Sequence, residues 1–201
     1  MLPERKLRVA LQSVPPVAIG GPWVRAIDAR LLQGAPPGEP EGSQPQPLWG
    51  GGARLHGGRF TPRGSFDTLY VASDLATLGL EIGSVLGAGK GVSRMKDPFT
   101  VVHVDGRMTH VLDLRDGTVL EALGTTVDEM TGSWRVEVAP PTHRLGMAAH
   151  ESERFCAIVA PSAKRAGKGF ILAVFTDRIG RFPPSFVQSI DTTGRLAQRI
   201  P

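Results

Sequence analysis

One stretch of the chain, residues 51–86, constrains the fold and the chemistry more than any other. It reads GGARLHGGRFTPRGSFDTLYVASDLATLGLEIGSVL. Its glycines let the backbone approach a ligand closely, and the arginine after them, Arg59, carries the planar guanidinium that binds phosphate oxygens in pairs. A strand over Thr68–Ala72 and an amphipathic helix follow, and the helix carries one carboxylate, Glu81. A guanidinium and a carboxylate on neighbouring elements suit a substrate that bears phosphate and develops positive charge as it reacts.

The helix after this strand is marked at both ends and along one face. Ser73 or Asp74 can cap it, because such a side-chain oxygen accepts a backbone N–H that lacks a partner in the first turn. The glycines at 87 and 89 end it. Its apolar residues repeat with helical spacing and predict one buried stripe, made of Leu75, Leu78, Ile82 and Val85. At about 100° per residue, Glu81 lies roughly 80° from the centre of this stripe, where a carboxylate is partly desolvated.

The composition indicates one folded domain spanning residues 1–201. Hydrophobic residues make up 41% of the chain, which is enough to build a core. The N-terminal residues lack the apolar region and cleavage site of a signal peptide, and no apolar run reaches the length of a membrane span. The single cysteine, Cys156, excludes an intramolecular disulfide and is typical of a small core residue. We therefore expect a cytoplasmic protein.

The net charge of +4 favours a partner or substrate with negative charge. Nucleic acid is one candidate, but the basic residues are scattered, and one tyrosine and three tryptophans make a poor base-stacking surface. No zinc-finger spacing is present in the sequence, and no clear helix-turn-helix. A small phosphate-bearing ligand explains the charge equally well.

The rest of the sequence predicts an α+β domain. Residues 34–52 contain eleven glycines and prolines among nineteen residues, which predicts a loop inserted within the domain. A helix is expected over 142–151, and strands outnumber helices. The strands besides Thr68–Ala72 are expected over 23–27, 99–104, 108–114, 134–138, 154–160 and 169–175, with a last one in the tail, 191–200.

Three familiar motifs are absent from the sequence. The run Gly87-Ala88-Gly89-Lys90-Gly91 lacks the first glycine of a P-loop and the Ser or Thr after the lysine, and it follows a helix instead of opening one. The five histidines are dispersed and no paired-cysteine spacing occurs, so we expect no metal. A G-x-S-x-G nucleophile elbow is also missing.

Several blocks together resemble the RES-domain family, which is named for an arginine, a glutamate and a serine. The family's G-A-R-L-x-G-G-R-W-N segment resembles residues 52–61, with Phe60 and Thr61 where the family usually has Trp and Asn. Its V-x-Y-L-A strand and A-L-x-x-L-E helix resemble residues 69–72 and 76–81, and its later P-S motif resembles Pro161-Ser162. A short match at Trp23-Val24-Arg25 resembles the family's early arginine. The resemblance covers roughly residues 22–200.

The resemblance implies an NAD-consuming enzyme with a fold similar to that of ADP-ribosyltransferases, a central split β-sheet with flanking helices. It implies NAD+ as substrate, inorganic phosphate as a candidate co-substrate, and no metal. The residues that it implies as catalytic are Arg59, Glu81 and Ser162. Those that it implies as binding NAD+ are Arg25, Arg54, Arg59, Tyr70 and Ser162.

The side chains agree with this chemistry. Nicotinamide leaves NAD+ as a cationic group that needs no proton, and the ribose passes through an oxocarbenium-like state, as in glycoside hydrolysis. Glu81 can stabilise that charge or hold a ribose hydroxyl. Arg59 can donate two parallel hydrogen bonds to the pyrophosphate or to an incoming phosphate. Tyr70 can stack on the nicotinamide ribose. Ser162, close in sequence to two basic residues, can hold a phosphate oxygen.

Three functions remain open at this stage. The first is a toxin that cleaves NAD+ with phosphate or water, and the second is an ADP-ribosyltransferase acting on a protein. The third is a non-catalytic basic module that binds nucleic acid, which would have no use for a carboxylate at the edge of a buried face. The resemblance also implies a cognate antitoxin with a helix-turn-helix DNA-binding part. From the composition we expect no membrane partner and no direct nucleic-acid binding.

Overall fold

The computed structural model describes residues 1–33, 44–86, 99–134, 139–165, 167–191 and 194–201, with the side chains of the helix after Thr68–Ala72 described up to Ile82. The helices are α1 (Glu4–Ser13), α2 (Ala29–Leu32), α3 (Gly51–His56), α4 (Leu75–Leu86), α5 (Gly117–Ala122), α6 (Val127–Thr131), α7 (Pro141–Glu151) and the 3-10 turn η1 (Ile179–Arg181). The strands are β1 (Val17–Gly20), β2 (Trp23–Asp28), β3 (Thr68–Ala72), β4 (Phe99–Asp113), β5 (Ala157–Pro161), β6 (Phe170–Phe175), β7 (Phe186–Ile190) and β8 (Gln198–Ile200). This is the α+β fold that the sequence predicts.

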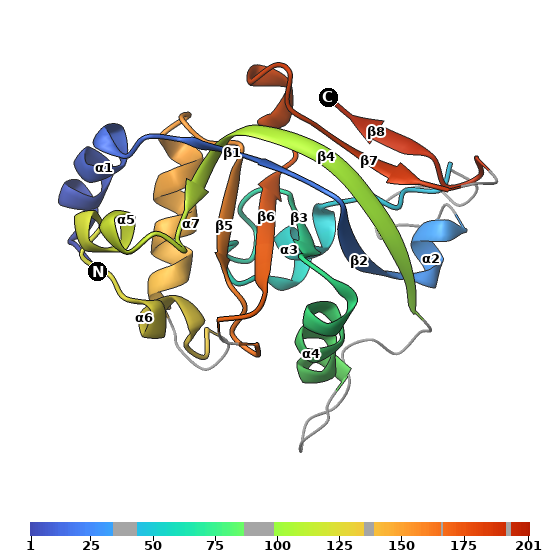
Figure 1. Cartoon of the computed structure of the whole chain (residues 1–201), viewed down its shortest axis with the longest axis horizontal. Coiled ribbons are helices and arrows are strands. Elements are labelled where there is room, and N and C mark those ends of the chain that lie inside the picture. Colours follow the sequence, from blue (N-terminus) through green and yellow to red (C-terminus); the bar gives the residue numbers. More distant parts are fainter. Residues whose placement is uncertain (34–43, 87–98, 135–138, 166, 192–193) are drawn as a thin grey trace.

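The sheet closes on itself through its longest strand. The strand order is β2-β3-β6-β5-β4, and β4 pairs again with β2, so these five strands form a ring. β4 and β5 are parallel, whereas the other neighbours in the ring are antiparallel. Figure 1 shows β4 as a long arc over β5 and β6, with β7 and β8 extending from its side. Within the described chain β2 and β3 share a single residue pair, Val24 with Ala72, so this is the narrowest junction of the ring.

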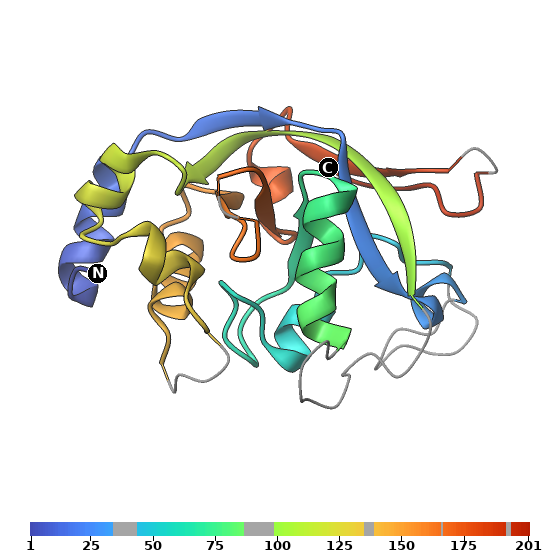
Figure 2. The same cartoon turned by 60° about the horizontal axis from the view of Figure 1, so that its bottom comes forward.

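Side-chain alternation along the strands separates the inside of the ring from its outer face. Val24 and Ala72 are directly paired and therefore point to the same face, where they pack with Leu78 and Ile82 of α4. Figure 2 shows α4 on this outer face, between the arc of β2 and β4 and the helices α6 and α7. The interior cluster takes residues from all five ring strands, including Trp23, Ile27, Leu69, Val71, Val104, Met108, Ala157, Val159, Leu172 and Val174.

A second part of the outer face is covered by α1 and α7. Leu7 and Leu11 of α1 and Leu145 and Ala148 of α7 are buried there. They pack in one cluster with outward-facing residues of β5 and β6, which are Ile158, Ala160, Ile171, Ala173 and Phe175. Cys156 is fully buried inside the ring, and burial raises the pKa of its thiol. It is the core cysteine that the sequence predicts.

The predicted helix after β3 is confirmed, with one error in its buried face. Asp74 is the cap, because its carboxylate accepts the backbone N–H of Thr77 at 2.8 Å. Leu78 and Ile82 are buried as predicted, whereas Leu75 is 59% exposed. The polar Thr77 is fully buried instead, because the segment before β6 covers that side of the helix and nothing described covers the side of Leu75. The side chain of Val85 lies outside the described residues.

The two strands predicted over 99–104 and 108–114 are one strand, β4. Residues between them resemble a turn in sequence, but Gly106 pairs with Val187 of β7. A Cβ at Gly106 would lie 2.6 Å from the carbonyl oxygen of Phe186, so glycine here permits close strand contact instead of a turn. A local pattern cannot reveal such a pairing, since the partner strand is about 80 residues away.

Several elements are absent from the sequence prediction. These are α1, β1, α2, α5, α6 and β7, together with α3, which begins at the last two glycines of the predicted loop over 34–52. Residues 34–43 of that loop, residues 135–138 of an expected strand and the run 87–91 lie outside the described residues. The strand expected in the tail is β8. No helix in the described part of the chain has the length and apolar character to cross a membrane.

Candidate active site

Ser162 and Glu81 meet on the outer face of the sheet. The hydroxyl of Ser162 donates to Oε1 of Glu81 at 2.7 Å. Ser162 directly follows β5 and is fully buried, whereas Glu81, on α4, is half-buried. The position predicted for Glu81, at the edge of the buried face, is therefore confirmed. The contact gives the carboxylate a fixed orientation, because a buried hydroxyl holds one of its oxygens.

The same serine oxygen also organises a turn. Ser162 Oγ accepts the backbone N–H groups of Lys164 at 3.2 Å and Arg165 at 3.1 Å. Arg165 in turn donates to the carboxylate of Asp74 at 2.6 Å, at the start of α4. The turn after β5 is thus tied to α4 at two places, by the Ser162–Glu81 contact and by the Arg165–Asp74 ion pair.

Arg59 lies next to this pair and is only 5% exposed. Its Nη1 donates to the carbonyl oxygen of Pro161 at 2.9 Å, one residue before Ser162. Its Nε donates to the carbonyl oxygen of Met130 at 2.7 Å, and Nη2 donates to the same oxygen. Burial lowers the pKa of Arg59 to about 10, while the nearby charge of Glu81 acts in the opposite direction. The guanidinium therefore stays charged at neutral pH and lies close enough to Glu81 for their charges to interact.

Tyr70 contacts the two residues that follow Arg59, in the segment that connects α3 with β3. Its hydroxyl accepts the backbone N–H of Phe60 at 2.8 Å and shares a 3.0 Å hydrogen bond with the hydroxyl of Thr61. Burial raises the pKa of Tyr70 to about 12, so the phenol remains protonated. Phe60 is fully buried, and Thr61 also bonds Thr68 at 2.8 Å. These two residues, which replace the family's Trp and Asn, thus bury an aromatic ring and complete the hydrogen bonds of Tyr70.

Two glycines allow this segment to lie close to its neighbours. A Cβ at Gly58 would be 2.7 Å from the ring and hydroxyl of Tyr70. A Cβ at Gly146, on α7, would be 1.8 Å from the carbonyl oxygen of Phe60. A side chain at Gly146 would therefore require the backbone at Phe60 to move, whereas one at Gly58 would displace the side chain of Tyr70. Both glycines thus allow the close packing on either side of Arg59 in the sequence.

Arg25 does not lie with Arg59, Glu81 and Ser162. Arg25 neighbours Val24 in β2, and successive strand residues point to opposite faces, so Arg25 points to the face opposite Tyr70. Its guanidinium donates to the carbonyl oxygens of Pro47 at 2.8 Å and Trp49 at 2.6 Å. Burial lowers its pKa to about 9. In this structure Arg25 holds the segment before α3, and its role in binding NAD+ stays a prediction.

Arg54 also has a partner elsewhere. It lies on α3 with its side chain 45% exposed, and its Nε donates to Asp67 at 2.7 Å. Among the described residues no hydrogen bond joins Arg54 to Arg59, Glu81 or Ser162. Its predicted contact with the substrate likewise stays a prediction.

Two supporting residues were missed by the sequence analysis. His143 of α7 bonds the carbonyl oxygen of Gly58 at 2.9 Å through Nε2, and burial lowers its pKa. Met130 contributes only its backbone carbonyl oxygen to Arg59. A histidine on a helix carries no signal for such a contact, and a backbone acceptor carries none at all. Among the described residues no three His, Cys, Asp or Glu side chains are grouped to hold a metal ion.

Comparison with known proteins identifies the family. The profile of the RES domain matches residues 32–196, a range that begins after Arg25 and includes the other predicted site residues. A crystal structure of the MbcT-MbcA toxin-antitoxin complex from M. tuberculosis matches with a TM-score of 0.66 at 19% identity, over 92% of this chain and 90% of that chain. At this identity the likeness shows a shared fold. No curated protein sequence matches the chain. Because the profile covers most of its length, the chain belongs to the RES domain family.

Proposed function

We propose that this protein is an NAD+-consuming toxin that cleaves the bond between nicotinamide and ribose, by phosphorolysis or hydrolysis. The observation that carries the proposal is the 2.7 Å hydrogen bond from Ser162 to Glu81, with the charge of Arg59 beside it. These are the three residue types for which the family is named. They come from three separate parts of the chain and meet at one place on the fold.

Cleavage of NAD+ requires a negative charge close to the ribose, and the carboxylate of Glu81 can supply it. The bond between N1 of nicotinamide and C1′ of the ribose breaks, and its electron pair leaves with the nicotinamide, which becomes neutral. Positive charge develops on the ribose, and an anionic carboxylate such as Glu81 stabilises it. An oxygen of water or phosphate then bonds to the same carbon, which is numbered C1″ in the product. Attack by water releases a proton to solvent and gives ADP-ribose, and attack by hydrogen phosphate gives ADP-ribose-1″-phosphate.

Ser162 and Arg59 would act mainly through position and charge. Ser162 holds one oxygen of Glu81, so the carboxylate is oriented before the substrate arrives. Arg59 holds the carbonyl of Pro161 and so fixes the backbone next to Ser162. Three of the five N–H donors of Arg59 point at backbone carbonyls, and its charge favours a phosphate anion nearby.

Product analysis tests this function. The purified protein is incubated with NAD+, with and without inorganic phosphate, and the products are separated and identified by mass. ADP-ribose-1″-phosphate selects phosphorolysis, and free ADP-ribose selects hydrolysis. A modified protein with little free product selects ADP-ribosyl transfer instead. Intact NAD+ under all conditions, with folded protein, contradicts an NAD+-consuming enzyme and favours the non-catalytic module.

The toxin part of the proposal rests on the family and on the fold shared with a toxin-antitoxin complex. An enzyme that consumes NAD+ harms its own cell, so its activity must be restrained. We propose a cognate antitoxin with a helix-turn-helix DNA-binding part and a second, acidic segment, because the toxin carries a net charge of +4. Expressing this chain alone should deplete NAD+ and stop growth, whereas co-expression with an adjacent antitoxin gene should restore both. Normal growth with soluble, folded protein contradicts the toxin role.

A further inference from the structure

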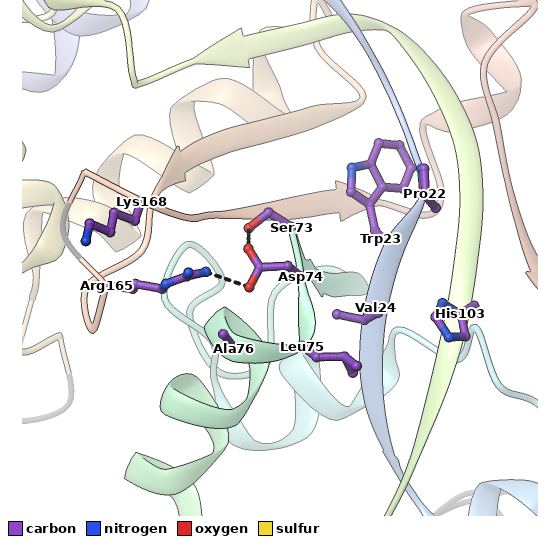
Figure 3. Close-up of a pocket in the computed structure, with 10 residues that line it drawn as sticks. All are labelled: Pro22, Trp23, Val24, Ser73, Asp74, Leu75, Ala76, His103, Arg165 and Lys168. Atoms are coloured by element: carbon purple, nitrogen blue, oxygen red, sulfur yellow. Dashed lines mark hydrogen bonds and ion pairs between the residues drawn. The ribbon is translucent and has the colours of Figure 1, made fainter.

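A pocket of about 600 Å³ lies over the first turn of α4, under the arc of β2 and β4. It runs from Lys168, in the turn before β6, to His103 on β4 (Figure 3). Neither Arg59, Glu81 nor Ser162 is among its lining residues. Its volume is in the usual range for small-molecule sites, roughly 300–1,000 Å³. The pocket is open to solvent, and a ligand bound there would lie apart from these three residues.

One end of the pocket has positive potential. Leu75 and Ala76 line it, and their backbone N–H groups have no acceptor within the helix, whereas the N–H of Thr77 is already capped by Asp74. The helix dipole adds partial positive charge at this end. Arg165 also lines the pocket, but it is paired with Asp74, so their charges offset each other. Lys168 is exposed, and no ion pair joins it to another described residue. The excess charge at this end is thus positive.

The indole of Trp23 supplies a second, independent observation. Trp23 is 1% exposed, and its Nε1 hydrogen has no acceptor among the described residues. Figure 3 shows this nitrogen turned toward Ser73 and Lys168, across the pocket. A buried N–H without an acceptor is costly and rare in folded proteins. An acceptor atom on a bound ligand would provide its partner.

The pocket wall is fixed in place before any ligand binds. A Cβ at Gly169 would lie 2.1 Å from the hydroxyl of Thr77, so the turn before β6 lies directly against α4. The backbone N–H of Ser162 donates to the carbonyl of Gly169 at 2.9 Å and closes this turn. Arg165 further joins the turn to Asp74 and Thr77. A pre-formed wall lowers the entropic cost of binding.

We propose that this pocket binds a phosphate-bearing ligand of mononucleotide size. The phosphate would lie between Lys168 and the first N–H groups of α4, which is the usual place for an anion on a helix. The body of the ligand would contact Pro22 and Leu75 and would present an acceptor to Nε1 of Trp23. This binding does not require that the protein cleaves NAD+, so the binding proposal and the proposed function are tested independently.

NMR with AMP as the probe tests the site on the full chain. The indole N–H signal of Trp23 is assigned with the variant Trp23→Phe, which keeps an aromatic ring but removes the donor. Adding AMP should shift this indole signal and the amide signals of Leu75 and Ala76 with one saturation curve. ADP-ribose and inorganic phosphate are the comparison arms. Absence of saturable shifts at these three signals with millimolar AMP overturns the proposal, and so does equal affinity for AMP and phosphate alone.

A pair of surface variants completes the test. Lys168→Gln should weaken AMP binding by about tenfold, because a charge-assisted contact to phosphate is lost. Lys6→Gln, which removes another exposed lysine, on α1 and outside the pocket, should leave the affinity unchanged. Both side chains are exposed, so both variants should fold. Equal loss of affinity in the two variants, or none in Lys168→Gln, shows only a general charge effect and overturns the site.

Discussion

The hydroxyl of Ser162 donates a 2.7 Å hydrogen bond to Oε1 of Glu81, although the two residues are 81 positions apart in the sequence. The contact joins the residue after β5 to the second turn of α4. It exists because β3 and β5 both pair with β6, which brings the ends of these strands to the same side of α4. The proposed chemistry depends on this contact, since it orients the carboxylate.

The first prediction concerns Ser162→Ala. The substitution removes the donor to Glu81 and the acceptor for the amides of Lys164 and Arg165. We expect kcat for NAD+ cleavage to fall by about tenfold to a hundredfold, with a smaller change in KM, because Glu81 loses its orientation and keeps its charge. Steady-state kinetics checks this. A change in KM alone would show that Ser162 binds the substrate and does not position Glu81.

The second prediction concerns Arg59→Lys. Lysine keeps the charge but cannot reach the carbonyls of Met130 and Pro161 together. We expect a loss of about 1–3 kcal/mol in the free energy of unfolding, because buried acceptors lose their partners. NAD+ cleavage should fall as well. Denaturant unfolding and kinetics measure the two effects.

Arg54→Lys is the matched control for Arg59→Lys. Arg54 is largely exposed, and its ion pair with Asp67 lies at the surface. Its free energy of unfolding should change by less than about 0.5 kcal/mol, as is usual for surface substitutions. Equal stability of Arg59→Lys and Arg54→Lys would contradict the anchoring role given to Arg59.

The third prediction concerns Gly146→Ala in α7. An added Cβ would lie 1.8 Å from the carbonyl oxygen of Phe60, and a backbone oxygen cannot move aside cheaply. We expect destabilisation of about 3 kcal/mol or more, at the upper end for overpacked sites. Gly79→Ala, in α4, is the control, because a Cβ there meets nothing within 4 Å. It should stabilise the protein by about 0.5–1 kcal/mol. Similar melting temperatures for the two variants would contradict the close packing of α7 on Phe60.

The sequence predicts local elements well and long-range pairings poorly. β2, β3, α4, β5, β6 and α7 follow from residue periodicity, and a cap at Ser73 or Asp74 follows from their side chains, of which the structure has Asp74. The continuity of β4 through Gly106 depends on β7, and the exposure of Leu75 depends on what covers α4. Both are settled by distant segments, which a local pattern does not contain.

The residues of the candidate site could be predicted from the sequence, but most of their contacts could not. Arg59, Glu81 and Ser162 were predicted because the family resemblance marks them, and their convergence is what the fold adds. Their partners could not be predicted from sequence, because Arg59 contacts backbone carbonyls. The early arginine, Arg25, matches a short motif, yet side-chain alternation in β2 turns it to the opposite face from Tyr70.

The fourth prediction concerns pH. Burial lowers the pKa of His143 below its ordinary value of 6.5. As pH falls below about 6.5, His143 is protonated more readily in the unfolded chain than in the folded one. This residue therefore lowers the free energy of unfolding at acidic pH. His143→Gln keeps an N–H donor for the carbonyl of Gly58 but does not titrate. The free energy of unfolding should fall less between neutral and mildly acidic pH in the variant than in the parent. Parallel curves for the two proteins would contradict a desolvated histidine.

The central claim is that Glu81 supplies the charge for NAD+ cleavage, and Glu81→Gln tests it most directly. The substitution keeps the shape and an acceptor for Ser162 but deletes the negative charge that faces the developing oxocarbenium. The measurement is the initial rate of nicotinamide release from NAD+ by the parent and the variant, both shown to be folded by their melting curves. The account predicts a rate lower by roughly 10²–10³, the usual effect of losing one electrostatic stabiliser. A rate within about tenfold of the parent, in folded protein, would contradict it.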